Sequence, residues 1–228
     1  MKKNLGIIIA AAGFSRRYGA GNKLLLEFRG VPLFLYSAKE FRRVCPEENI
    51  VIVCSEDAVH EFKDIAMKLL PENRFNFVVG GEQRSDSVKN GLKALPESVE
   101  FAAVHDAARP LATCELLLKC LEAARSHGGA IPAKPVTDTL KRTDDTGKII
   151  ETVCRGDLWR VETPQVFDVE KLCTAYNKAE GANIEFTDDA AVMEYAGYPV
   201  YVVNDLANNM KVTFSADIRA LDSIEKDL

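Results

Sequence analysis

IIIAAAGFSRRYGAGNK, residues 7–23, joins a buried strand to a glycine-rich loop that carries basic side chains. Residues 5–10 form an uninterrupted apolar run, which is typical of a strand covered on both faces of a sheet. The small residues that follow would let a ligand approach the backbone closely, while Arg16, Arg17 and Lys23 supply positive charge. Backbone N–H groups and fixed cations together bind polyphosphates, so the segment predicts a phosphate-binding loop, with a solvated basic turn as the alternative.

Two common nucleotide-binding motifs are missing from this loop. A Walker loop needs GxxxxGK followed by Ser or Thr, but here five residues separate Gly13 from Gly19, and no Ser or Thr follows Lys23. The dinucleotide fingerprint GxGxxG requires a second glycine where Ser15 stands. The sequence therefore disfavours an ATPase, a GTPase and an NAD-dependent dehydrogenase, and it leaves other nucleotide chemistry open.

Composition restricts the classes to which the chain can belong. With 228 residues, of which 47% are hydrophobic, it is long enough for one large domain with a sizeable core. The net charge of −5 argues against a nucleic-acid surface, because binding to a phosphate backbone requires an extended basic face. The six cysteines are scattered without a CxxC pair and are accompanied by only three histidines, so a zinc site is not expected.

The N-terminus has the charged and apolar parts of a signal peptide, but its apolar run is short and continues directly into the glycine-rich loop. We interpret it as the first strand of the fold. This interpretation predicts a cytoplasmic protein without a membrane span.

Strand and helix patterns alternate along most of the chain. Strands are expected at residues 5–10, 50–54, 75–79, 101–105, 130–136 and 200–203. Helices are expected at residues 31–44, 58–70, 85–95, 169–178 and 215–228, from the N-cap Thr113 to His127, and from about residue 187. This alternation predicts an α/β fold with a mostly parallel sheet and helices on both faces.

Residues 137–163 break the alternation. Two runs of alternating side chains flank the sequence DDTG at residues 144–147, which is a hairpin signal. A two-stranded projection is only marginally stable alone, so we expect this β-arm, at about residues 137–160, to pack against a second subunit.

Four groups of polar or small residues follow predicted strands. They are the first loop; Gly80, Gly81, Gln83, Arg84 and Ser87; His105, Asp106 and Arg109; and Asn208, Asn209, Lys211 and Thr213. Ligands of open α/β sheets bind beyond the carboxyl ends of the strands, so four such groups predict a binding site at that edge. Asp188 and Asp189 are interpreted as charges at a helix N-terminus in preference to ligands.

Seven segments occur in the order found in one family: AAAGFSRRYGAGNK, GGEQRSDSV, VHDAARP, PVTDTLKR, RGDLWRVETPQVF, TDDAAVMEYAG and NNMKVT. Through them nearly the whole chain resembles the 2-C-methyl-D-erythritol 4-phosphate cytidylyltransferase family of the non-mevalonate isoprenoid pathway. The resemblance implies a Rossmann-like nucleotide-transferase fold with a twisted sheet, formed by residues 1–228 as one domain, and a homodimer made through the protruding β-arm. The implied reaction transfers CMP from CTP to methylerythritol 4-phosphate and releases pyrophosphate, with Mg²⁺ present.

The resemblance also implies the roles of individual residues. The catalytic cations are Arg17, Lys23, Arg155 and Lys211: the first two stabilise the α-phosphate and the departing pyrophosphate, and the last two grip the acceptor phosphate. The residues implied to bind CTP are Ala11, Ala12, Gly13, Gly80, Gly81, Ser87 and Asp106, and Asp106 is also the candidate contact for the metal. Further acceptor contacts are Arg109, Thr139 and Thr163. His105 is expected to be structural, because an ionised acceptor phosphate needs no general base.

Two alternatives stay open. Ribitol 5-phosphate cytidylyltransferases share the first loop and the TPQ element, but they more often carry an AGG start and a valine in HDAVRP. Here Ala12 precedes Gly13 and the later segment reads HDAARP, which favours methylerythritol phosphate as the acceptor. A non-catalytic nucleotide-binding subunit is disfavoured, because it would need only some of the four cations.

Overall fold

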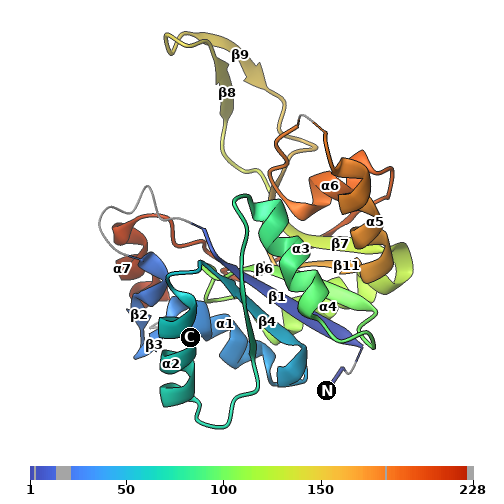
Figure 1. Ribbon diagram of the computed structural model, residues 1–228. Helices are drawn as coiled ribbons and strands as arrows, with labels where there is room; N and C mark the ends of the chain where they lie inside the picture. Colours follow the sequence, from blue (N-terminus) through green and yellow to red (C-terminus); the bar gives the residue numbers. More distant parts are fainter. Residues whose placement is uncertain (3, 14–21, 183, 225–228) are drawn as a thin grey trace.

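The computed structural model describes residues 1–2, 4–13, 22–182 and 184–224. Its centre is an eight-stranded sheet in the order β10-β7-β11-β6-β1-β4-β5, with β12 paired to β7. Figure 1 shows helices packed on both faces of this sheet and a hairpin that projects from one end. The α/β architecture with a protruding arm, predicted from the sequence, is therefore confirmed.

Four strands form the parallel centre of the sheet: β1 (Leu5–Ala11), β4 (Ile50–Cys54), β5 (Asn76–Val79) and β6 (Phe101–Asp106). Strand β1 pairs in parallel with β4 on one side and with β6 on the other, and β4 pairs in parallel with β5. Both β1 and β4 are covered on both faces, which explains their unbroken apolar sequences. Because these strands run in the same direction, their carboxyl ends meet at one edge of the sheet.

The other half of the sheet is mixed. It contains β7 (Gly129–Pro135), β10 (Trp159–Val161), β11 (Gln165–Asp168) and β12 (Tyr201–Asn204). Strand β11 lies antiparallel between β6 and β7, so its first residues lie beside the last residues of β6. Strands β10 and β11 were not predicted from the sequence, because both are very short and β11 is buried on both faces and so lacks alternation.

Helices cover both faces of the sheet. One core contains α1 (Leu33–Phe41), α2 (Val59–Leu69) and α4 (Cys114–His127), and the other contains α3 (Arg84–Ala94), α5 (Val169–Ala179) and α6 (Asp189–Tyr195). Ile7 and Ile9 of β1 belong to the first core and Ile8 to the second, as the period of two in a strand requires. None of the helices within the described part of the chain is long and apolar enough to cross a membrane.

The remaining elements are small. A short pair, β2 (Glu27–Phe28) and β3 (Val31–Pro32), precedes α1, so the helix predicted at residues 31–44 is shorter at its start than expected. Helix α7 (Ser215–Ile224) packs against this region through Leu221. The single turn η2 (Glu47–Asn49) leads into β4.

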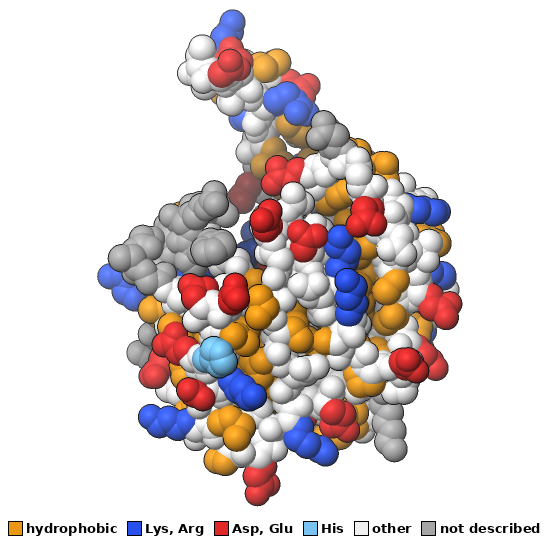
Figure 2. Space-filling model, in the orientation of Figure 1, with side chains coloured by type: hydrophobic (Ala, Val, Ile, Leu, Met, Phe, Trp, Pro, Cys, Tyr) orange, Lys and Arg blue, Asp and Glu red, His pale blue; other side chains and the backbone are white. Residues whose placement is uncertain are grey.

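The predicted hairpin is formed by β8 (Leu140–Thr143) and β9 (Ile149–Val153), which make a separate two-stranded sheet. Its turn is ordered by Asp144, whose Oδ1 atom accepts hydrogen bonds from the backbone N–H groups of Thr146 and Lys148, each at 3.0 Å. Figure 2 shows hydrophobic side chains among the charged ones on this arm, which stands away from the body. The arm therefore exposes apolar surface.

Helix α3 lies unusually close to the sheet at Gly91. A Cβ atom placed there would lie 2.6 Å from Cγ2 of Ile8 and 3.1 Å from Cγ2 of Val53. We expect Gly91→Val to lower the free energy of unfolding by about 2 kcal/mol through overpacking, measured as a lower urea midpoint. Gly156→Val is the matched control, since nothing lies within 4 Å of its Cβ position. Equal midpoints for the two variants would contradict this packing.

Candidate active site

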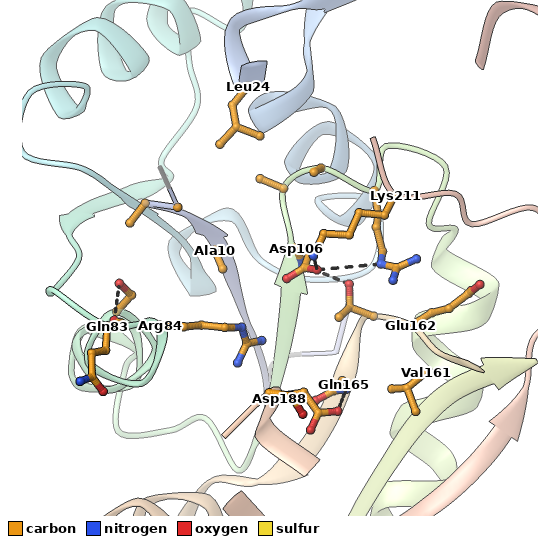
Figure 3. Close-up of a pocket in the computed structure, with 18 of the residues that line it drawn as sticks. Ala10, Leu24, Gln83, Arg84, Asp106, Val161, Glu162, Gln165, Asp188 and Lys211 are labelled. Carbon is orange, nitrogen blue, oxygen red and sulfur yellow. Dashed lines mark hydrogen bonds and ion pairs between the residues drawn. The ribbon is translucent and has the colours of Figure 1, made fainter. Parts of the chain in front are cut away.

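A pocket of about 520 Å³ lies at the sheet edge where β1 and β6 end. Figure 3 shows its side chains converging from the sheet, from α3 and from loops that are distant in the sequence. The lining residues fall within residues 10–13, 23–24, 81–87, 106–109, 161–165 and 187–188, together with Lys211. All four predicted groups of strand-end residues thus contribute to one cavity, whose size suits a small-molecule ligand.

Asp106, the last residue of β6, stands among the cations of the pocket (Figure 3). Its Oδ2 atom accepts a hydrogen bond from Lys211 Nζ at 2.6 Å and lies 4.0 Å from Arg109 Nε. Burial by itself would raise the pKa of Asp106, but nearby positive charges, that of Lys211 above all, outweigh burial and hold the pKa below its usual value. The carboxylate is therefore ionised at neutral pH and fixes the direction of Lys211.

Lys23 enters the pocket from the single turn η1 (Lys23–Leu25), which is capped by Asn22. Its Nζ atom donates a hydrogen bond to the carbonyl of Val212 at 3.1 Å, and the N–H of Val212 donates to the loop that follows β6. These contacts join the first loop, the loop after β6 and the segment that carries Lys211. Lys23 and Lys211 consequently reach one pocket from opposite ends of the sequence.

Arg84, at the start of α3, is held by a buried acid. Its Nη2 atom donates to Oδ2 of Asp189 at 2.6 Å, and the Tyr176 hydroxyl donates to Oδ1 of the same carboxylate at 2.5 Å. Burial by itself would lower the pKa of Arg84, but the adjacent carboxylate of Asp189 outweighs it and raises the pKa above its usual value. Figure 3 shows Arg84 reaching from α3 toward the middle of the pocket, so it adds a permanent positive charge there.

Gln165 and Asp188 line the pocket below Arg84 in the view of Figure 3. Gln165 donates through Nε2 to Asp188 Oδ2 at 2.8 Å, while its Oε1 atom accepts from the backbone N–H of Asp189 at 3.2 Å. Asp188 also caps α6, because its Oδ1 atom accepts from the N–H of Ala191 at 3.0 Å. The interpretation of Asp188 as a charge at a helix N-terminus is confirmed, and the same side chain also lines the pocket.

His105 has a structural environment. It is fully buried, its Nε2 atom lies 2.9 Å from Ser37 Oγ, and its Nδ1 atom lies 3.1 Å from Thr163 Oγ1. Burial lowers the pKa of His105 to about 4, so the ring is neutral at pH 7. Thr163 Oγ1 in turn accepts from the N–H of Asp106 at 3.0 Å, so this network fixes the end of β6.

Small residues shape the wall between β1 and α3. A Cβ atom at Gly80 would lie 2.6 Å from both Ala12 Cβ and Ser87 Oγ. One at Gly81 would lie 2.2 Å from Asp86 Cβ, and the N–H of Gly81 donates to Ser87 Oγ at 3.1 Å. Glycine is therefore required at both positions for the backbone to approach this close.

The structure places most of the predicted site residues together. The pocket is lined by Ala12, Gly13, Lys23, Gly81, Ser87, Asp106, Arg109, Thr163 and Lys211. Ala11 and Gly80 adjoin this lining, Ala11 being buried in the core. Thr139 and Arg155 are exposed on or near the arm, and neither is among the residues that line the pocket. Arg155 donates to the carbonyl of Thr137. Arg17 lies outside the described residues.

Among the pocket side chains without a role predicted from the sequence are Arg84, Glu162, Gln165 and Asp188. Arg84 was part of a strand-end group. Its position shortly after Gly80 and Gly81 was the sequence feature that could have indicated a role in the pocket. Gln165 belongs to a strand that the sequence analysis did not predict. Its role depends on contacts with α6, which no local pattern reveals.

Comparison with known proteins identifies the same family over nearly the whole chain. The family model for IspD, 2-C-methyl-D-erythritol 4-phosphate cytidylyltransferase, matches residues 5–226. The chain is 37% identical to a protein of that name from Dictyoglomus thermophilum, over 98% of this chain and 97% of that protein. It is 38% identical to one from Trichormus variabilis, over 96% of each.

Solved structures give the same result. The crystal structure of 4-diphosphocytidyl-2C-methyl-D-erythritol synthase from Anaerococcus prevotii has a TM-score of 0.83 and 30% sequence identity, covering 98% of this chain and 99% of that one. The crystal structure of 2-C-methyl-D-erythritol 4-phosphate cytidylyltransferase from Thermus thermophilus has a TM-score of 0.80 and 29% identity, covering 97% and 98%. The similarity therefore extends over the body and the arm.

The ion pair between Arg84 and Asp189 can be tested for its contribution to the free energy of unfolding. Asp189→Asn removes the charge that faces a partly buried guanidinium, so we expect the free energy of unfolding to fall by about 3 kcal/mol. Adding Arg84→Met should restore part of the loss, because no buried charge then stays unpaired. Chemical unfolding of the wild type, both single variants and the double variant measures the coupling energy. A coupling energy near zero would show that the two groups do not support each other.

Proposed function

The chain belongs to the 2-C-methyl-D-erythritol 4-phosphate cytidylyltransferase family, and from this membership we propose how its pocket carries out the reaction. The enzyme transfers CMP from CTP to 2-C-methyl-D-erythritol 4-phosphate in non-mevalonate isoprenoid biosynthesis. The products are 4-diphosphocytidyl-2-C-methyl-D-erythritol and pyrophosphate. This membership disfavours both the ribitol 5-phosphate enzyme and a non-catalytic subunit.

The proposal is carried by one observation: Lys23, Arg84, Arg109 and Lys211 line the same pocket. Both reactants are anions, so their mutual repulsion opposes the attack of the acceptor phosphate on the α-phosphorus of CTP. Lys23, with Arg17 of the same loop, would stabilise the negative charge that develops on the α-phosphate and on the departing pyrophosphate. Lys211, directed by Asp106, would bind the phosphate of the acceptor.

No general base is required in this scheme. The acceptor phosphate is already ionised near neutral pH, and its oxygen is the nucleophile. His105 is buried and neutral, and its two ring nitrogens are engaged with Ser37 and Thr163, which agrees with a structural role. Arg109 and the Thr163 side chain are proposed as further acceptor contacts.

Selection of cytosine is assigned to the backbone between β1 and α3. Cytosine presents a 4-amino donor and ring acceptors, which carbonyl and N–H groups can recognise. Ala11, Ala12, Gly13, Gly80 and Gly81 would supply this backbone, and Ser87 a hydroxyl close to the base or the ribose. The close approach at Gly80 and Gly81 is consistent with a narrow slot that excludes a purine.

Mg²⁺ is proposed as the metal. The described residues include no group of three or more His, Cys, Asp or Glu side chains that could hold an ion alone. Mg²⁺ commonly binds one or two carboxylates, substrate phosphates and water, and the ionised carboxylate of Asp106 fits that mode. When bound with CTP, the ion would neutralise negative charge on the triphosphate.

The arm supports a homodimer. Ile149 and Ile150 are 58% and 61% exposed, and an apolar two-stranded projection gains stability by packing on a partner. We propose that the arm of one subunit reaches the partner's pocket and brings Arg155 and Thr139 to the acceptor. Residues 1–228 would then act as one nucleotidyltransferase domain with an arm at about residues 137–160. The six free thiols agree with a cytoplasmic location.

Substrate specificity tests the assignment. With Mg²⁺ and CTP, methylerythritol 4-phosphate should be used about 10²-fold better than ribitol 5-phosphate in kcat/KM, and CTP should be preferred over UTP and ATP by at least a similar factor. Release of pyrophosphate is the readout. Equal or reversed preference for ribitol 5-phosphate would move the protein to the competing function.

Mixing of variants tests whether the arm crosses the dimer. Lys23→Ala and Arg155→Ala should each lower kcat by about 10²-fold or more, because each removes a cation from the reacting centre. If Arg155 acts in the partner's pocket, mixed dimers contain one site with both defects and one intact site. Activity should therefore recover after subunit exchange. Verified mixed dimers without recovery would place Arg155 in the pocket of its own subunit.

A further inference from the structure

Two buried acids, Glu162 and Asp205, interact electrostatically with Arg109. Glu162 follows β10 and Asp205 follows β12, two strands that both pair with β7, and each acid is only 4% exposed. The N–H of Glu162 donates to the carbonyl of Pro132 at 2.8 Å, and the N–H of Asp205 donates to the carbonyl of Ala133 at 3.0 Å. Consecutive residues of β7 thus hold the two acids, whose carboxyl groups interact electrostatically.

Two buried oxygen atoms of this pair lack a hydrogen-bond donor unless a proton lies between the two acids. Asp205 Oδ1 accepts from the N–H of Ala207 at 2.9 Å, but Oδ2 of Asp205 and Oε2 of Glu162 are buried and have no donor among the described residues. Ionised carboxylates only accept hydrogen bonds, so one proton between the two acids would satisfy both atoms. Burial and the neighbouring Asp205 raise the pKa of Glu162 to about 7, which agrees with such a shared proton.

Arg109 is a cation of the pocket lining that interacts electrostatically with this pair. Its side chain is 12% exposed, and its Nη1 atom donates to the carbonyl of Asn209 at 2.7 Å. Its Nε atom is buried and has no hydrogen-bond partner within the described part of the chain. Arg109 interacts electrostatically with Glu162, with Asp205 and with Asp106. The positive charge of its guanidinium is therefore balanced by the buried pair and by Asp106.

We propose that Glu162 and Asp205 share one proton and together act as positioning residues for Arg109, so that loss of this proton weakens binding of the acceptor phosphate. The inference rests on the proposed contact between Arg109 and the acceptor. With the proton present, the pair carries one negative charge, which holds Arg109 in place. Without it, a second negative charge attracts the guanidinium toward the pair and repels the phosphate dianion.

Several other charges surround this cluster. The ionisable groups that act on the pair or on Arg109 are Lys134 of β7, Arg160 of β10, Asp106 of β6, and Lys119 and Cys120 of α4. All of them are retained in Glu162→Gln, whose amide can still donate a hydrogen bond to Asp205. A comparison of this variant with the wild type therefore isolates the shared proton.

Acceptor binding is the first readout. The KM for methylerythritol 4-phosphate is measured at pH 6 and pH 8 for the wild type, for Glu162→Gln and for the exposed control Glu97→Gln. The ratio of the wild-type KM to the Glu162→Gln KM should rise about fivefold or more between these pH values, because only the wild type gains a charge beside Arg109. The ratio of wild type to Glu97→Gln should stay constant. A constant ratio for Glu162→Gln would overturn the positioning role.

Stability is the second readout, and it needs no substrate. The folded pKa of Glu162 is raised from 4.5 to about 7, so the folded protein binds more protons than the unfolded chain between these values. The Tm of the wild type relative to Glu162→Gln should therefore fall as pH rises from about 4.5 to about 7, and level off above it. A flat difference would overturn the shared proton itself.

Together the two readouts separate this inference from the proposed function. If the Tm difference changes with pH but the KM ratio does not, the pair shares a proton without positioning Arg109, and the inference is wrong. Arg109→Ala then tests the proposed contact directly: an unchanged KM for the acceptor would contradict that contact as well. Turnover of methylerythritol 4-phosphate by the wild type tests the reaction independently of both.

Discussion

The ion pair between Asp106 and Lys211 is the interaction on which the pocket depends. It joins the end of β6 to a segment that lies 105 residues later, with Lys211 Nζ 2.6 Å from the carboxylate. Segments near both ends of the chain meet at this ion pair, because Lys23 donates to the carbonyl of Val212, the residue after Lys211. Without a negative charge at this position, the cations would repel one another at the edge of the sheet. The parallel strands bring the groups together, and Asp106 allows them to stay there.

Three cations of the pocket, Arg84, Arg109 and Lys211, each interact with an acid that is less exposed than the cation. Lys211 is held by Asp106, while Arg84 is held by the fully buried Asp189. Arg109 interacts electrostatically with Glu162 and Asp205, the buried acids that follow β10 and β12. Because the acids lie deeper than the cations, the positive ends face the cavity, where two anionic reactants must meet. Such fixed charge is more effective than mobile surface charge, since it needs no reorganisation during the reaction.

Much of the fold could be predicted because its signals are local. Strands such as β1 and β4 are apolar runs, α4 has Thr113 as its N-cap, and the arm has a turn sequence between alternating runs. The orientation of Arg84 could not be predicted, because Asp189 lies 105 residues away in the sequence. The burial of Glu162 could not be predicted from the sequence either, since it depends on β7 lying between β10 and β12. Arg155 was assigned by family resemblance, and within one chain it does not line the pocket.

Measurement of turnover and CTP affinity in Asp106→Asn tests the central claim most directly. The substitution keeps the shape of the side chain and removes the charge that directs Lys211. If the carboxylate organises the cations, kcat should fall by about 10²-fold, while the Kd for CTP measured by calorimetry without Mg²⁺ should be unchanged or lower, because the pocket becomes more positive and no metal contact is lost. Turnover within about threefold of the wild type would contradict the account, because the cations would then hold their positions without Asp106.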